Sequence, residues 1–275
     1  MPAPSLTITR TTPIYHTLSV GGVFVQWHVN DPETDYTFRV ERSESYEGPF
    51  EILVSATTDF HAFDPHEISS TLEEEARNFL SLQRKNYYRV TATAPGKATF
   101  SDTKILGDEL ARRQWLLKRK ILRDITIGFK FNSIPFAILK RKHAGTRCTA
   151  CFDPISKSIL DSRCKTCLGT GYITGYYAPV YVSARKGVTN VTTTLAPQGK
   201  TEVNQVELTV LDYPAVEVDD IIVEVRQGRR YLVKHVARTE LRGVPVHQRL
   251  VMSELARDSV EYKIVLQPRT SPALY

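Results

Sequence analysis

The 275-residue chain has four cysteines, all within one short segment, in the pattern C-x2-C-x12-C-x2-C. Two thiolate pairs at this spacing suit a tetrahedral zinc ion, because each C-x-x-C turn presents two sulfurs at one corner of the site. A site closed by four thiolates leaves no coordination position open for water or substrate. The pattern therefore predicts one structural Zn²⁺ per chain, bound by Cys148, Cys151, Cys164 and Cys167.

The alternative is a pair of disulfides or four unrelated buried thiols. The N-terminal sequence MPAPSLTITRTTP has no basic and apolar signal segment, so nothing indicates an oxidising compartment. The glycines after the second pair, Gly169 and Gly171, are expected to let the backbone turn tightly, so that amides point at the sulfurs. The metal site is therefore the favoured interpretation.

Positive charge is concentrated in the middle of the chain. Residues 1–110 have 9 Lys and Arg against 16 Asp and Glu, a net charge of −7. Residues 111–147 have 11 against 1, a net charge of +10, and residues 148–275 have 16 against 13, a net charge of +3. The middle segment is where we expect a phosphate backbone or an acidic partner to bind.

The first hundred residues predict short strands separated by turns. Residues 23–29, 36–43, 50–54 and 87–92 alternate apolar and polar side chains or are rich in β-branched and aromatic residues. Residues 65–83 interrupt this pattern, and their apolar residues suggest an inserted helix: Leu72, Ala76, Phe79, Leu80 and Leu82.

This N-terminal part resembles a fibronectin type III module. Trp27 lies in an early strand and is followed by YTFRVERS, GPFEIL and YYRVTA, and the resemblance covers about residues 5–106. It implies a seven-stranded β-sandwich of the kind that binds or spaces other proteins, although a fold alone does not set a function.

A basic helix is predicted from about Gly107 to Arg123, capped by Asp102 or Asp108, with Leu110, Leu117 and Ile121 on one face. A run of charge commonly means only a solvated helix face. The stretch Lys140–His143 is also basic, and residues 134–139 before it predict a strand. The candidates for contact with DNA or an acidic partner are Arg112, Arg113, Lys118, Arg119, Lys120, Arg123, Lys140, Arg141 and Lys142.

The C-terminal part predicts strands again, at residues 176–182, 205–210, 219–225, 229–236 and 246–252, with a turn at Gln227–Gly228. Antiparallel strands in this number suggest a small barrel. The predicted fold is therefore mainly β: a fibronectin III-like sandwich with an inserted helix (1–106), a basic helix and linker strand (107–147), a zinc knuckle (148–172), a small β-barrel (173–265) and an extended tail (266–275).

The sequence does not predict an enzyme. It contains no GxSxG, HExxH or P-loop motif, and no GxGxxG after a strand. His143 could replace a thiolate, but four cysteines make a fifth ligand unnecessary, and His235 and His247 lie within predicted strands. No apolar run approaches the roughly 18 residues of a membrane helix.

Two segments resemble virion proteins of tailed bacteriophages. Residues 216–240, VEVDDIIVEVRQGRRYLVKHVARTE, are similar to the small barrel of head-closure or neck proteins that join portal to tail, with Asp219-Asp220 where Gly-Asp is usual. Residues 147–180, RCTACFDPISKSILDSRCKTCLGTGYITGYYAPV, are similar to zinc-bearing connector proteins of contractile-tailed phages.

This resemblance implies a structural virion protein, assembled in the host cytoplasm, that forms a homo-oligomeric ring in the neck or an adjacent tail layer. Zinc would make a loop rigid, and the basic helix would face passing DNA or acidic neighbouring proteins. The barrel and the residues Thr270–Tyr275 would make subunit contacts, for example by strand addition.

Two other functions remain open. A zinc-ribbon nucleic-acid-binding factor would use basic residues around the knuckle and the aromatic residues Tyr172, Tyr176 and Tyr177. Those basic residues are Arg141, Lys142, Arg147, Lys157, Arg163 and Lys165. A thiol enzyme would use Cys164 and Cys167, but a metal bound by two matched pairs would occupy these thiolates.

Overall fold

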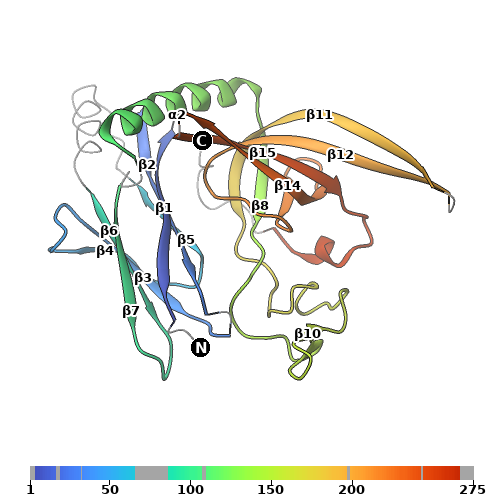
Figure 1. The fold of residues 1–275 in the computed structure, drawn as a ribbon, viewed down its shortest axis with the longest axis horizontal. Coiled ribbons are helices and arrows are strands. Elements are labelled where there is room, and N and C mark those ends of the chain that lie inside the picture. Colours follow the sequence, from blue (N-terminus) through green and yellow to red (C-terminus); the bar gives the residue numbers. More distant parts are fainter. Residues whose placement is uncertain are drawn as a thin grey trace.

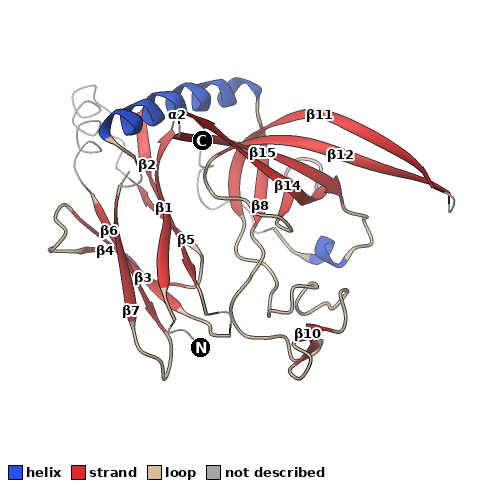
Figure 2. Cartoon of the chain, viewed as in Figure 1, coloured by secondary structure: helices blue, strands red, loops and turns tan. Residues whose placement is uncertain are grey.

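The computed structural model describes residues 4–16, 19–31, 33–65, 86–106, 110–196, 199–242 and 244–266. Within these residues the fold is mainly β, with one long α-helix (Figure 2). Nearly all of the predicted inserted helix at 65–83 lies outside the described residues, as do Asp108 and the tail after Leu266.

Two antiparallel sheets form the N-terminal part (Figure 1). Alternate residues are buried as the sequence pattern predicts, for example Phe38 and Val40 in one strand and Tyr88 and Val90 in its neighbour. The first sheet has the order β1-β2-β5 and the second the order β4-β3-β6-β7. Their strands are β1 (Leu6–His16), β2 (Ser19–Val29), β3 (Thr37–Ser43), β4 (Glu51–Thr57), β5 (His61–Pro65), β6 (Tyr87–Thr93) and β7 (Phe100–Ile105).

Helix α2 (Arg112–Asn132) starts and ends later than the sequence predicted. Asp102 is not its cap, since its carboxylate accepts a hydrogen bond from the Ile8 N–H at 2.8 Å. Instead the Gln114 side chain accepts one from the Ala111 N–H. The helix continues to Asn132 because its buried stripe continues beyond Arg123, and Leu122 and Phe129 enter the core of the N-terminal sheets. No helix of the described residues is apolar over a stretch long enough to cross a membrane.

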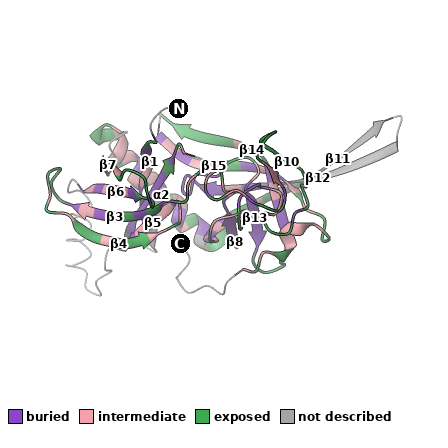
Figure 3. Cartoon of the chain, turned by 90° about the horizontal axis from the view of Figure 1, so that it is seen from below, coloured by how far each residue is buried: buried purple, intermediate pink, exposed green. Residues whose placement is uncertain are grey.

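A six-stranded antiparallel barrel follows the helix, with strand order β11-β12-β15-β14-β13-β8. Its interior holds alternate residues of each strand, among them Phe136, Val182, Leu208, Tyr231 and Leu250, and these residues are buried (Figure 3). Its strands are β8 (Ile134–Leu139), β11 (Val180–Ala196), β12 (Gly199–Leu211), β13 (Ile221–Glu224), β14 (Arg230–Leu241) and β15 (Val244–Glu254). A 3-10 helix, η1 (Val260–Lys263), follows the last strand.

The segment 134–139, predicted as a linker strand, belongs to the barrel. Its backbone pairs with β11 on one side and with β13 on the other, so it closes the barrel. The reason is chemical, because IPFAIL has apolar side chains on both faces: Phe136 and Ile138 point into the barrel, and Ala137 and Leu139 pack with Ile264 and Leu266. The barrel therefore begins before the knuckle.

A buried carboxylate joins all three parts of the chain. Asp212, just after β12, receives the Lys118 ammonium of α2 at 2.8 Å and the Arg10 guanidinium of β1 at 3.2 Å. The Asp212 side chain is only 2% exposed. Close to it, Leu211 and Tyr213 belong to the same core as the N-terminal sheets and the helix. At Asp212 and its neighbours, the sheets, the helix and the barrel therefore share both an apolar core and a buried set of ion pairs.

The stability of the N-terminal part should depend on pH through the protonation of His61. The His61 ring stacks on the Phe24 ring, with 5.1 Å between the ring centroids. Burial lowers the pKa of His61 to about 4, although the negative charge of Asp59 acts to raise it. Because the unfolded pKa is about 6.5, the unfolded chain binds more protons, and stability falls as the pH drops from about 6.5 to about 4. We expect the free energy of unfolding to fall by about 2 kcal/mol between pH 7.5 and about pH 5 because of this protonation.

Urea unfolding of the wild type and of His61→Phe at both pH values measures this effect. Phenylalanine keeps an aromatic ring in the stack but cannot take up a proton. The difference in unfolding free energy between the two pH values should be smaller in the variant by about 2 kcal/mol. An equal pH dependence of the two proteins would contradict the assignment.

Candidate metal centre

The four cysteines lie at the end of an excursion from the barrel between β8 and β11. The outgoing and returning segments run side by side, since the Tyr177 N–H donates to the Lys140 carbonyl and the Lys142 N–H to the Gly175 carbonyl, both at 2.9 Å. The same ladder continues where the Cys148 N–H donates to the Gly171 carbonyl. This paired stem places the knuckle away from the barrel wall (Figure 1).

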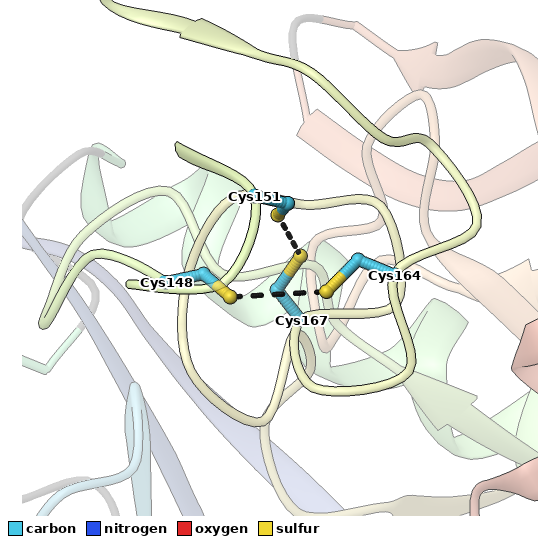
Figure 4. A group of neighbouring side chains, drawn as sticks. All are labelled: Cys148, Cys151, Cys164 and Cys167. Carbon is cyan, nitrogen blue, oxygen red and sulfur yellow. Dashed lines mark hydrogen bonds between the residues drawn. The ribbon is translucent and has the colours of Figure 1, made fainter. Parts of the chain in front are cut away.

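The four sulfurs point toward one another (Figure 4). All four Sγ atoms lie within 4.8 Å of one another, and the cysteines are buried. The Cys148–Cys164 sulfurs are 3.9 Å apart and the Cys151–Cys167 sulfurs 3.2 Å, whereas a disulfide requires about 2.05 Å. Metal–sulfur bonds of about 2.3 Å in a tetrahedron place sulfurs about 3.8 Å apart. The cluster therefore has the donors and spacing to hold a metal ion.

The two C-x-x-C turns have the same local geometry. The Phe152 N–H donates to the Cys148 carbonyl at 3.1 Å, and the Leu168 N–H to the Cys164 carbonyl at 2.9 Å. Backbone amides also reach the two sulfurs of the second pair. The N–H groups of Cys167 and Thr166 lower the pKa of the Cys164 thiol to about 6. Burial raises the pKa of the Cys167 thiol, and the N–H groups of Gly171 and Gly169 oppose that increase. These two glycine amides thus point at a sulfur, as the sequence predicted.

The backbone conformation at position 169 requires glycine, so replacement of Gly169 should weaken metal binding by the four cysteines. Its φ is +76°, and an added Cβ would lie 2.5 Å from the Ser162 carbonyl oxygen. We expect Gly169→Ala to cost about 1–3 kcal/mol and to weaken metal binding by roughly 10- to 100-fold, since the ligand turn must shift. Competition with a chromophoric chelator measures the affinity.

Gly128→Ala is the matched control for this prediction. Gly128 lies in α2, and a Cβ there meets nothing within 4 Å. Alanine should therefore leave metal affinity unchanged and stabilise the helix by about 0.5–1 kcal/mol. Equal metal affinities of the two variants would contradict the role given to Gly169.

The predicted basic residues of the helix fall into two groups. Lys118 is buried in the pair with Asp212 and does not face solvent, and the guanidinium of half-buried Arg119 lies over the Trp115 ring at 5.3 Å. The others lie on one solvent-exposed stripe: Arg112, Arg113, Lys120 and Arg123.

The basic side chains before the first cysteine interact with other groups of the same chain. The Lys140 ammonium is 2.9 Å from Glu217 and 3.4 Å from buried Asp220, and the Arg141 guanidinium is 2.8 Å from Asp219. Lys142 is half-buried, and burial lowers its pKa. His143 faces Glu217 at 3.6 Å and is not part of the cysteine cluster. Lys140 and Arg141 thus hold the stem to the segment before β13, whereas the Lys142 ammonium donates to the Ile173 carbonyl within the excursion.

The sequence did not indicate a contact between the knuckle and the N-terminal sheets. The Arg147 guanidinium lies over Phe152 at 4.5 Å and over Tyr172 at 4.3 Å, and it pairs with Glu33 at 3.1 Å. Nearby, the Thr146 N–H donates to Asp35 at 3.1 Å. Only the acidic turn around Glu33 and Asp35 could have suggested this contact in advance.

The aromatic residues proposed for base stacking are covered. Tyr172 is buried beneath Arg147, and Tyr176 and Tyr177 are half-buried, with burial raising the pKa of Tyr177 to about 12. In contrast, Lys157, Arg163 and Lys165 on the knuckle are exposed.

No protein-family model matches the chain, and no curated protein matches it in sequence.

Proposed function

We propose that the chain is a structural protein of a tailed-bacteriophage virion that forms a homo-oligomeric ring in the neck, where head and tail are connected. One observation carries the proposal: β11 and β12 extend from the barrel as a two-stranded ribbon (Figure 1). β11 pairs with β8 only over Val180–Ala184, and β12 pairs with β15 only over Gln205–Leu211. Beyond these residues, and within the part of the chain that the structure describes, the two strands pair only with each other, up to Ala196 and Gly199.

A two-stranded ribbon is marginally stable by itself, and its outer edges carry unpaired backbone groups. A neighbouring subunit that adds a strand or covers a face would satisfy them. The ribbon therefore supports a protein that works in an assembly, and its length supports a contact that reaches well beyond one barrel.

The other parts fit a building unit. The three- and four-stranded sheets around one core support a fibronectin III-like sandwich, which would brace or decorate the ring. The four-cysteine cluster would hold one structural Zn²⁺ per chain, because four sulfur donors suit this ion and leave no position for substrate. The protein would not be an enzyme.

The exposed stripe of Arg112, Arg113, Lys120 and Arg123 would contact DNA phosphates, or the acidic surfaces of other neck and tail proteins, without reading sequence. Such a contact suits DNA that moves past a ring.

A second candidate is a zinc-ribbon nucleic-acid-binding factor, favoured by the exposed Lys157, Arg163 and Lys165. The covered tyrosines and the ion-paired Lys140 and Arg141 count against it.

The absolute mass of the purified protein by light scattering, with metal content on the same sample, tests the proposal. The wild type should form a closed species of many subunits with one zinc per chain. A ribbon variant, in which Asn-Gly replaces residues 191–204, should stay monomeric and keep its zinc, because this pair makes a tight hairpin turn between Asn190 and Gln205. A wild type that is monomeric at every concentration and binds DNA at low salt would overturn the ring and favour the second candidate.

A further inference from the structure

The zinc knuckle exposes apolar side chains that the metal site does not use. Ile155 is 92% exposed and Leu160 is 73% exposed, and both lie between the two cysteine pairs. Large apolar side chains this exposed, gathered on one loop and surrounded by charge, are typical of a protein-binding surface. We call Ile155, Lys157, Leu160, Arg163 and Lys165 the knuckle tip.

The knuckle tip is held in shape before any partner binds. The Asp153 carboxylate accepts hydrogen bonds from the Ile155 N–H at 3.0 Å and from the Ser156 hydroxyl at 2.6 Å. On the other side of the turn, the Leu160 N–H donates to the Cys151 carbonyl at 2.8 Å. A surface ordered in advance loses little conformational entropy on binding, which favours association.

A surface with complementary properties lies on the N-terminal sheets, at the hairpin between β3 and β4. Tyr46 is 66% and Ile52 51% exposed there, and Glu44, Glu47 and Glu51 beside them are exposed as well. We call these five residues the acidic rim. A depression of about 420 Å³ lies at the rim, and its lining combines polar side chains with two apolar ones: Arg42, Ser43, Glu44, Glu51, Asn86, Pro49 and Phe50.

We propose that the knuckle tip of one copy binds the acidic rim of the next copy. Charge supports this pairing, since the exposed cations Lys157, Arg163 and Lys165 on the tip would meet the exposed carboxylates of Glu44 and Glu47 on the rim, while the third carboxylate, Glu51, pairs with Arg42 at 2.9 Å. An apolar contact would add to it, since the exposed Ile155 or Leu160 would meet Pro49 and Phe50 in the wall of the depression. The tip and the rim lie on separate parts of the molecule, near β10 (Ser158–Ile159) and β4 (Figure 1), so the contact joins different copies.

Contacts between two different surfaces of identical subunits generate a closed ring when the rotation between copies closes, and a filament when it does not. The inference therefore rests on the proposed ring and names the surfaces that build it. The tip alone is smaller than the roughly 800 Å² per partner of a stable interface, so the β11–β12 ribbon would supply the remaining area.

Two charge-reversal variants test the pairing. The tip variant is Lys157→Glu with Arg163→Glu, and the rim variant is Glu44→Lys with Glu47→Lys. Each variant alone places like charges on both surfaces, so each should be monomeric by light scattering where the wild type assembles. Mixed in equal amounts, they present opposite charges at every contact, and assembly should return with the two variants alternating.

The matched control is Arg226→Glu with Arg257→Glu, which reverses two exposed charges outside both surfaces and should assemble like the wild type. Zinc content verifies that the tip variant keeps its metal. Wild-type assembly of either variant alone, or a mixture that remains monomeric, would overturn the pairing and leave the ring itself standing. A wild type that never assembles would overturn the ring and the pairing together.

Discussion

Replacement of Cys164 by serine is expected to abolish metal binding and unfold the knuckle, while the N-terminal sheets stay folded. Among the described residues, the buried cluster at the centre of the knuckle consists of the four cysteines, so little apolar core would hold the knuckle together once the metal is lost. Structural zinc contributes about 10–16 kcal/mol in small zinc domains, and here that free energy would order the segment between the stem strands.

Trypsin provides the measurement, because Lys157, Arg163 and Lys165 are exposed cleavage sites inside the knuckle. In the wild type, the metal should hold the backbone at these sites in turns, whereas trypsin binds a peptide segment in an extended conformation. In Cys164→Ser we expect cleavage there about 100-fold faster, which corresponds to ~3 kcal/mol of local stability. Metal content should fall from the proposed one ion per chain to none.

Thr166→Ser is the control for the cysteine variant. It changes a neighbouring side chain that is exposed, and it keeps the backbone N–H that points at Cys164. Its zinc content and cleavage rate should match those of the wild type. A Cys164→Ser protein that resists trypsin as well as the wild type would show that the knuckle does not depend on metal.

Asp212→Ala is expected to be the most destabilising substitution outside the knuckle. It would leave the ammonium of Lys118 and the guanidinium of Arg10 in a buried site without their carboxylate. Breaking a buried pair in this way costs about 3–5 kcal/mol, which lowers the melting temperature by roughly 6–20 °C in a protein of this size. Thermal unfolding followed by circular dichroism measures the shift.

Glu207→Ala gives the matched comparison, because it also removes a carboxylate from an ion pair. Its partner Arg249 is 57% exposed, and exposed pairs contribute only about 0–1 kcal/mol. The two variants should therefore differ in melting temperature by several degrees. Equal shifts would mean that Asp212 does not join the three parts of the chain as described.

Local sequence patterns predicted the features that depend on neighbouring residues. The cysteine spacing identified the four residues that the fold brings within 4.8 Å, and alternation identified β3 and β6 with their buried residues. The glycine amides at Cys167 were predicted for the same reason, because a turn is decided over a few residues.

The sequence was a poor guide where the deciding partner is distant. Lys118 and Lys140 looked like free cations in a basic run, but their carboxylates, Asp212 and Asp220, are 94 and 80 residues away along the chain. The strand at 134–139 looked like a linker for the same reason, since its barrel neighbours come after the knuckle. Charge runs and apolar runs do not specify which distant group they meet.

The insertion of the knuckle within the barrel has a consequence for a chain that emerges from the ribosome. All four cysteines are present once Cys167 is made, but the barrel cannot close until β15 ends at Glu254, almost ninety residues later. At a synthesis rate of about 5–20 residues per second, this interval lasts roughly 4–17 s. A metal ion bound during that time would bring the ends of β8 and β11 closer, so that these two strands could pair before the remaining barrel strands are made. Halving a loop in this way saves about 0.6 kcal/mol of closure entropy. Metal supply during synthesis would therefore influence how fast the barrel forms, as well as how stable the finished protein is.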